Sequence, residues 1–159
     1  MLPLLLVPAA LQAVTMFADE WIFHRKRGLP RWERLGHPLD TLTAILCYAW
    51  LVLVPPSHPY ALGTYLGLCA FSCLFITKDE FVHAKFCEPL ENWLHAVLFV
   101  LHPVVFLAFG IIWHSGNDAW ALNGALASTL ALLAYQLLYW NLRSAARVQP
   151  SSGRLEDAE

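Results

Sequence analysis

The stretch "KDEFVHAKFCEPLENWLHAVLFVLHP", from Lys78 to Pro103, decides the fold because it joins two apolar runs. The run before it extends from Tyr60 to Thr77, and the run that begins inside it extends from Trp93 to Gly110. Each run approaches the roughly 20 apolar residues that a membrane-spanning helix needs. Carboxylates, histidines and a cysteine are therefore concentrated where two apolar segments meet.

The composition of the whole chain favours an integral membrane protein. Of the 159 residues, 58% are hydrophobic and only 14% are charged, whereas a soluble domain has about 45–50% apolar and about 25% charged residues. Helix is the default in lipid because its backbone polar groups are satisfied internally. We therefore predict an all-α, polytopic membrane helix bundle with about five transmembrane helices. The candidate spans are Leu2–Phe23, Leu39–Val54, Tyr60–Thr77, Trp93–Trp113 and Ala119–Trp140.

The distribution of basic residues predicts the orientation of this bundle. Five Lys and Arg residues lie between Arg25 and Arg34, whereas the loop "PPSHPY" (residues 55–60) contains none. The positive-inside rule then places the N-terminus outside and the C-terminus in the cytoplasm, and we expect a bacterial inner membrane. The domain prediction is one transmembrane helical domain over residues 1–142. The polar residues 143–159 are expected to form a disordered cytoplasmic tail.

A repeat links the opening stretch to an earlier part of the chain. "ADEWIFHRKRGLPRWERLGHPLD" (Ala18–Asp40) and "KDEFVHAKFCEPLENWLHAVL" (Lys78–Leu98) share the order Asp-Glu-aromatic, His, Pro, Glu, His. Each copy joins two predicted spans, so both copies enter the membrane in the same direction. Such parallel repeats are related by an axis along the membrane normal. We therefore predict a tandem two-helix repeat with a pseudo-twofold axis, which relates helices 1–2 to helices 3–4.

The spacing within each copy predicts a metal site at the cytoplasmic end of the bundle. Glu and His residues three or four positions apart share one face of a helix, and Pro30 and Pro89 suit the first turn of the second helix of each copy. Asp19, Asp40 and Asp79 are expected to support the ligands, and His102 is expected to line a substrate pocket further along the bundle. The predicted metal ligands are Glu20, His24, Glu33, His37, Glu80, His83, Glu91 and His95.

This ligand pattern resembles that of the di-iron four-helix-bundle proteins of the ferritin-like class, over roughly residues 18–98. That class places a Glu on each of two helices and Glu-x-x-His on each of the other two. The present chain departs from it, because only Glu80 and His83 have the Glu-x-x-His spacing and the histidines are more numerous. Eight ligands exceed the first shell of one ion, so we expect two ions. Iron is favoured, with zinc or manganese as alternatives.

These features predict a membrane-embedded di-metal oxidoreductase of the hydroxylase or desaturase type. Its substrate would be lipophilic and would reach the site at the cytoplasmic membrane face. No nucleotide-binding motif occurs in the sequence, so electrons would come from a separate donor protein, and no nucleic-acid partner is expected. Two alternatives are a di-zinc hydrolase of a membrane lipid and a non-catalytic metal-binding or transport protein. A hydrated rim or a proton relay is the remaining interpretation of the same residues.

Overall fold

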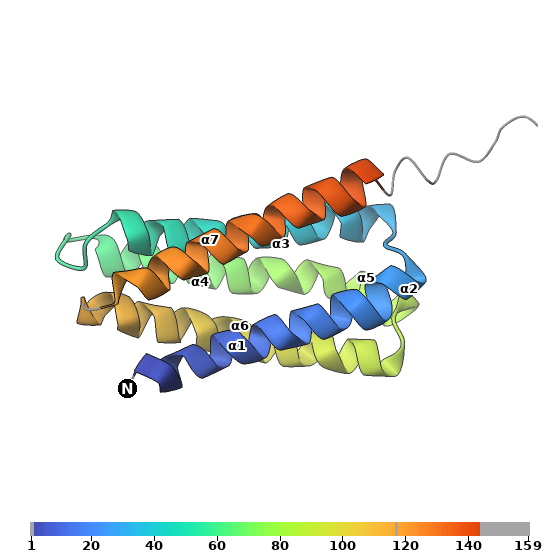
Figure 1. Ribbon diagram of the computed structural model, residues 1–159, viewed down its shortest axis with the longest axis horizontal. Helices are drawn as coiled ribbons and strands as arrows, with labels where there is room; N and C mark the ends of the chain where they lie inside the picture. Colours follow the sequence, from blue (N-terminus) through green and yellow to red (C-terminus); the bar gives the residue numbers. More distant parts are fainter. Residues whose placement is uncertain (1, 117, 144–159) are drawn as a thin grey trace, which may run out of the picture.

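The computed structural model describes residues 2–116 and 118–143, which form five helical rods along the long axis of the molecule (Figure 1). The first rod consists of α1 (Leu2–Ala18), the π-helical turn η1 (Asp19–His24) and α2 (Arg25–Arg27), and the second is α3 (Arg31–Leu53). The prediction of an all-α bundle is confirmed. The other rods are α4 (Ala61–Phe75) with the 3₁₀ turn η2 (Ile76–Asp79) and α5 (Glu80–Phe86); α6 (Pro89–Ser115); and α7 (Ala119–Tyr135) with the π-helical η3 (Gln136–Arg143).

Proline and glycine residues set where the rods begin and end. Pro30 immediately precedes α3, and Pro89 is the first residue of α6, where its missing N–H is not needed. Gly28 follows α2 with φ +77°, and Gly116 follows α6 with φ +71°, in the left-handed range that glycine enters without strain. The connections between α2 and α3 and between α5 and α6 are consequently short. Both lie at the same end of the bundle (Figure 1).

Four of the helical segments are long and apolar enough to cross a membrane, judged by length and composition. The predicted span Leu39–Val54 falls within α3, which begins with polar and charged residues and is therefore less hydropathic. Many large apolar side chains also face outward, as is compatible with a lipid environment. The predicted tail lies outside the described residues from residue 144 onward. The four candidate spans are Leu2–Arg27, Ala61–Asp79, Pro89–Ser115 and Ala119–Leu142.

The rods pack in a definite order. α1 packs chiefly on α6, and α3 packs on both α4 and α7. Gly110 permits the contact between α6 and α4, because a Cβ atom there would lie 2.9 Å from the Tyr65 ring. The apolar core fills the end of the bundle opposite the α2–α3 connection. Its largest buried members are Tyr48, Tyr65, Phe106, Phe109, Ile112 and Trp113.

Candidate metal centre

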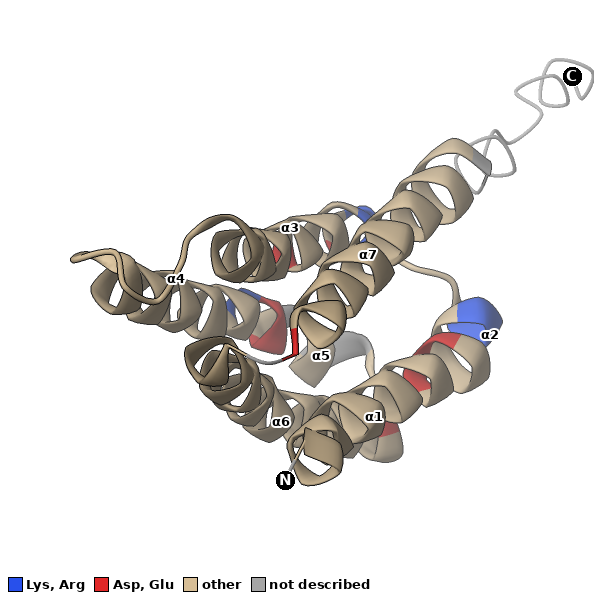
Figure 2. Ribbon diagram, turned by 60° about the vertical axis from the view of Figure 1, so that its left-hand side comes forward, with Lys and Arg blue, Asp and Glu red and all other residues tan. Residues whose placement is uncertain are grey.

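The end of the bundle that contains η1 and α5 buries an unusual number of ionisable side chains. Figure 2 marks acidic positions on the η1 rod, on α3 and on the α4–η2 rod. Charged residues are almost never fully buried unless they are paired or bind a cation. The side chains buried at this end are Asp19, His24, Glu33, Asp79, His83, Glu91 and His95, each at most 5% exposed.

Asp19 lies at the middle of this cluster. Its Oδ2 atom is 3.1 Å from His24 Nε2 and 3.1 Å from His95 Nε2. Glu91 Oε1 lies 3.7 Å from the same His24 nitrogen. One donor atom from each of these four residues falls within 4.8 Å of the others. Since metal–oxygen and metal–nitrogen bonds are about 2.0–2.2 Å long, this group has the dimensions of a single-ion site.

Two further groups of the same dimensions adjoin the first. His24, Glu33 and His37 form one, and His83, Cys87 and His95 form the other. Because His24 and His95 each belong to two groups, the three groups are continuous. The rings of His83 and His95 are stacked with centroids 3.9 Å apart, and those of His24 and His37 are 5.1 Å apart. This continuous set of residues, with Asp19 and Glu91, is called the His–carboxylate cluster below.

Many donor atoms of the His–carboxylate cluster are buried without a hydrogen-bond partner in the described part of the chain. Buried polar atoms in folded proteins nearly always have one. Here the unpartnered atoms come from different helices and are the atoms that metal ions bind. Their concentration fits a bound cation better than a structural hydrogen-bond network. The atoms are Asp19 Oδ1, Glu33 Oε1, His37 Nε2, His83 Nδ1 and Nε2, and His95 Nδ1, together with His24 Nε2, whose 3.1 Å contact with Asp19 lacks hydrogen-bond geometry.

The charge of the cluster leads to the same conclusion. Asp19, Glu33 and Glu91 are three carboxylates with exposures of 4%, 0% and 1%. Arg27 contacts two of them, with Nη2 2.9 Å from Glu33 Oε2 and 2.8 Å from Glu91 Oε1. No Lys or Arg in the described part of the chain forms an ion pair with Asp19, whose ion-pair partners there are His24 and His95. Such burial is costly without further positive charge, and divalent metal ions would supply it.

His83 lies outside the long apolar segments, and its surroundings lower its pKa. Burial, and then the neighbouring His95, lower the pKa of His83 to about 4. Its imidazole is therefore neutral at pH 7, and a neutral ring nitrogen has a lone pair for a metal. Burial also raises the pKa of the Cys87 thiol to about 12. Metal coordination would be needed to make that thiol a thiolate.

From the sequence, Glu20 was expected among the central donor residues and Asp19 beside them, but the structure places them the other way round. Glu20 Oε2 lies 3.3 Å from His24 Nδ1, and the carboxylate also accepts hydrogen bonds from Tyr135 and Trp140. A carboxylate on one ring nitrogen orients the imidazole and directs the other nitrogen to a metal. Glu20 therefore positions His24, whereas Asp19 occupies the centre. Neighbouring helical residues differ by about 100° in direction, so only one of the two reaches the centre.

The second Asp-Glu pair, Asp79 and Glu80, shows the same difference in burial between its two members. Glu80 is exposed and outside the three groups, whereas Asp79 is 3% exposed and has an unpartnered Oδ1 atom. Lys78 Nζ binds Asp79 at 2.9 Å and Asp40 at 2.6 Å. Gly36 on α3 permits this approach, because a Cβ atom there would lie 3.1 Å from Asp79 Oδ1. Asp40 is thus held by Lys78 beside the cluster rather than by a histidine.

His102 lies outside the His–carboxylate cluster. Its Nε2 atom is 3.0 Å from Ser72 Oγ, and its Nδ1 atom is 3.4 Å from Gln12 Nε2. Sequence reasoning missed Cys87 and Arg27 as members of the site. The position of Cys87 four residues after His83 is a signal that could have identified it, because such residues share a helix face.

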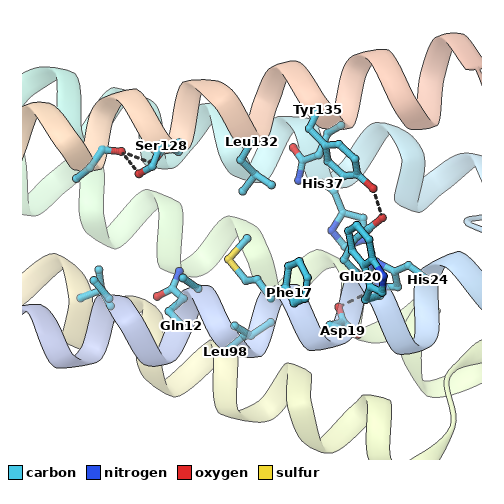
Figure 3. Close-up of a pocket in the computed structure, with 18 of the residues that line it drawn as sticks. Gln12, Phe17, Asp19, Glu20, His24, His37, Leu98, Ser128, Leu132 and Tyr135 are labelled. Atoms are coloured by element: carbon cyan, nitrogen blue, oxygen red, sulfur yellow. Dashed lines mark hydrogen bonds and ion pairs between the residues drawn. The ribbon is translucent and has the colours of Figure 1, made fainter.

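A cavity of about 490 Å³ extends from the cluster between α1 and α7 (Figure 3). Its volume is within the range of about 300–1,000 Å³ that is typical of small-molecule sites. Asp19, His24, His37 and His95 line one end of it, and apolar side chains line most of the remainder. Comparison of the chain with protein-family models, with curated proteins and with solved structures finds no match.

Proposed function

We propose that this chain is an integral membrane oxidoreductase with two metal ions, of the hydroxylase or desaturase type, that acts on a lipophilic substrate. The observation that carries the proposal is the set of buried, unpartnered imidazole and carboxylate atoms that converge from four rods. The cavity beside them supports a lipophilic substrate, because its lining is mainly apolar. Iron is the proposed metal, since mixed nitrogen and oxygen ligands suit it.

The proposal includes the membrane arrangement. The cluster would lie near the cytoplasmic surface, with the N-terminus outside, because the basic residues of α2 and the start of α3 are at the cluster end. The packing of the rods supports the proposed repeat. A pseudo-twofold axis would superpose α1 on α4 and α3 on α6. It would therefore relate the α1–α6 contact to the α4–α3 contact, and both contacts are present.

The residues of the cluster other than Cys87, and two residues beside it, have definite parts in this proposal. Asp19 and Glu91 would be carboxylate ligands, because Asp19 lies 3.1 Å from histidines of two rods and Glu91 lies 3.7 Å from His24. His24, His37, His83 and His95 would be terminal ligands. Glu20 would hold the His24 ring, and Arg27 would hold Glu33 and Glu91 in place while it offsets one of their charges.

The proposed hydroxylation would consume dioxygen, two electrons and two protons. Bound iron would supply the activation of dioxygen. In hydroxylation, one oxygen atom enters a C–H bond of the substrate and the other leaves as water. Two electrons and two protons complete the balance, and a separate electron-donor protein would supply the electrons. The chain itself would orient the hydrocarbon and exclude water through the apolar walls of the cavity.

One observation favours a second candidate, a di-zinc hydrolase of a membrane lipid. Cys87 joins His83 and His95 in one of the three groups, and zinc is commonly bound by thiolate and imidazole together. In that case His83, Cys87 and His95 would hold zinc, which would supply the activation of water, and a carboxylate of the cluster would accept the proton.

The test separates the two candidates and the non-catalytic alternative. Full-length protein in detergent would be loaded with ferrous iron or with zinc, and dioxygen consumption would be followed after chemical reduction. The proposal predicts uptake by the iron-loaded protein, which is lost in His95→Ala and retained in His114→Ala. Lipid hydrolysis by the zinc-loaded protein would establish the second candidate instead. Metal binding with neither activity would reject both and support a metal-binding or transport role.

A further inference from the structure

A second cavity, of about 170 Å³, also borders the His–carboxylate cluster. It shares His37 and His95 with the larger cavity, but its wall also contains Asp40 and Asp79, which do not line the larger one. Ionisable side chains therefore face the second cavity from α3, η2, α5 and α6. These side chains are His37, Asp40, Asp79, His83, His95 and His102.

Asp40 and Asp79 share one cation. Lys78 Nζ lies 2.6 Å from Asp40 Oδ1 and 2.9 Å from Asp79 Oδ2. Figure 2 shows a basic and an acidic position next to each other at the end of the α4 rod. In the described part of the chain, no other Lys or Arg forms an ion pair with either carboxylate. One proton shared between the two carboxyl groups would relieve the repulsion between them.

Asp40 is the more accessible member of the pair. Its side chain is 17% exposed and that of Lys78 is 20% exposed, whereas that of Asp79 is 4% exposed. Lys78 binds only the Oδ1 atom of Asp40, so the other oxygen is left for water. Lys78 and Asp79 lie in the chain between Thr77 and Glu80, which are both exposed. The pair is therefore close to the molecular surface as well as to the second cavity.

The second cavity has room for water. One buried water needs about 10–15 Å³ of accessible space and two to four polar partners, and the volume of about 170 Å³ exceeds that space severalfold. Asp40, Thr41 and His102 place polar side chains in the wall. Water in this cavity would connect Asp40 with the histidines of the cluster.

The proposed reaction requires such a connection. Two protons must reach the cluster for each dioxygen, but Asp19, Glu91 and His95 of the cluster are each at most 5% exposed. The larger cavity is lined mainly by apolar side chains, which neither donate nor accept protons. Proton transfer needs an ionisable side chain within hydrogen-bond reach of the acceptor or linked to it by water. The second cavity supplies that arrangement.

We propose that Asp40, with Asp79 and Lys78, forms the proton entrance to the cluster. The Asp40 carboxyl group gives its proton to the cluster through water in the second cavity, and the resulting carboxylate is protonated again from the solvent beside Lys78. Electrons do not move in this step and come separately from the donor protein. The inference rests on the proposed function and names the proton-delivery residue of its reaction.

The first test measures dioxygen uptake by full-length protein that has been loaded with ferrous iron and chemically reduced. Asp40→Asn should lower the rate by about 10²–10⁴-fold, because general acid catalysis contributes that much. It should also increase the solvent deuterium isotope effect and leave the iron content unchanged. Asp40→Glu should retain most of the rate. Glu80→Gln is the matched control, because Glu80 is exposed and lines neither cavity.

Three results would overturn the inference. One is an Asp40→Asn protein with the rate and isotope effect of the unaltered protein. Another is an equal loss of rate in Asp40→Asn and Glu80→Gln. The third is a lower rate that accompanies loss of iron without a change in the isotope effect, which would show that Asp40 has only a structural part.

The second test does not depend on iron. Infrared spectra of the metal-stripped protein at neutral pH should contain a protonated-carboxyl band that weakens in Asp40→Asn and persists in Glu80→Gln. If the unaltered iron-loaded protein takes up no dioxygen but this band is present, the proposed function is rejected and Asp40 is retained as a proton site. If Asp40→Asn leaves the band unchanged, the inference is overturned whether or not dioxygen is consumed.

Discussion

The two ends of the bundle are built from the same helices but differ in whether their buried polar atoms have hydrogen-bond partners. At the core end, Tyr65 donates to the Phe106 carbonyl at 2.6 Å and Trp113 donates to the Val54 carbonyl at 2.8 Å. At the cluster end, particular atoms of Asp19, Glu33, His37 and His83 are equally buried but have no hydrogen-bond partner among the described residues. The core end therefore has the character of a stability element. The cluster end carries uncompensated polar atoms, as is expected where a ligand completes the structure.

The largest expected effect is the loss of metal when the cluster is broken. His95→Ala removes a side chain that belongs to two of the three donor groups, so bound metal should fall by about half or more. His114→Ala is the control, since His114 is exposed at the opposite end of α6. Elemental analysis of both purified variants measures the difference. Equal metal content in the two would show that His95 is not a ligand.

A substitution at the core end should lower the stability of the protein and leave its metal binding unchanged. Phe106 is 2% exposed, and Phe106→Ala should destabilise the protein by about 3–5 kcal/mol through lost burial and the cavity left behind. The folded fraction should still bind metal normally. Thermal unfolding in detergent measures the stability, with Leu107→Ala as the control because Leu107 is 65% exposed. Loss of metal from folded Phe106→Ala protein would contradict the separation of the two ends.

The paired carboxylates of the repeat give a smaller effect. Glu20→Ala should lower metal affinity by about 10–100-fold, because in the proposed site this carboxylate would orient His24 rather than bind metal itself. Glu80→Ala should change the affinity little, since Glu80 is exposed and outside the donor groups. Competition with a chromogenic chelator measures both affinities. A larger loss in Glu80→Ala than in Glu20→Ala would reverse the roles assigned to the two residues.

The smallest predicted effect is the loss of one hydrogen bond inside the core. Tyr65→Phe removes the hydrogen bond to the Phe106 carbonyl, which should cost about 1 kcal/mol of stability. Metal content should stay unchanged. Tyr60→Phe, at a position 73% exposed, is the reference for the same chemical change in solvent. If both substitutions lowered the unfolding temperature equally, the buried hydrogen bond would contribute no more to stability than the exposed hydroxyl group of Tyr60.

The sequence predicted the helical class and the end of the bundle where ionisable residues gather. It did so because apolar length and the spacing of Glu and His report directly on helices and their faces. It did not predict which member of each Asp-Glu pair turns inward. Asp19 rather than Glu20 is central, and Asp79 rather than Glu80 is buried. That choice depends on the π-helical turn η1 and the 3₁₀ turn η2, which change helical phase without a mark in the local pattern.

Arg27 was also outside the predicted site. Its position three residues after His24 places it past the last apolar residue, where a basic residue is ordinarily a membrane-interface residue. In the structure it turns back to bind Glu33 and Glu91. Packing between rods distant in sequence determined that contact. The cavity between α1 and α7 likewise depends on which rods pack together, and the sequence pattern carries no information on that.

The most direct test of the account is the metal content of the full-length protein purified in mild detergent. We predict about two ions per chain, with iron predominant, because the donor atoms exceed the first shell of one ion. Treatment with a chelator should remove them, and ferrous iron should restore them. Protein that contains no stoichiometric metal as purified, and takes up neither iron nor zinc on reconstitution, would contradict the account.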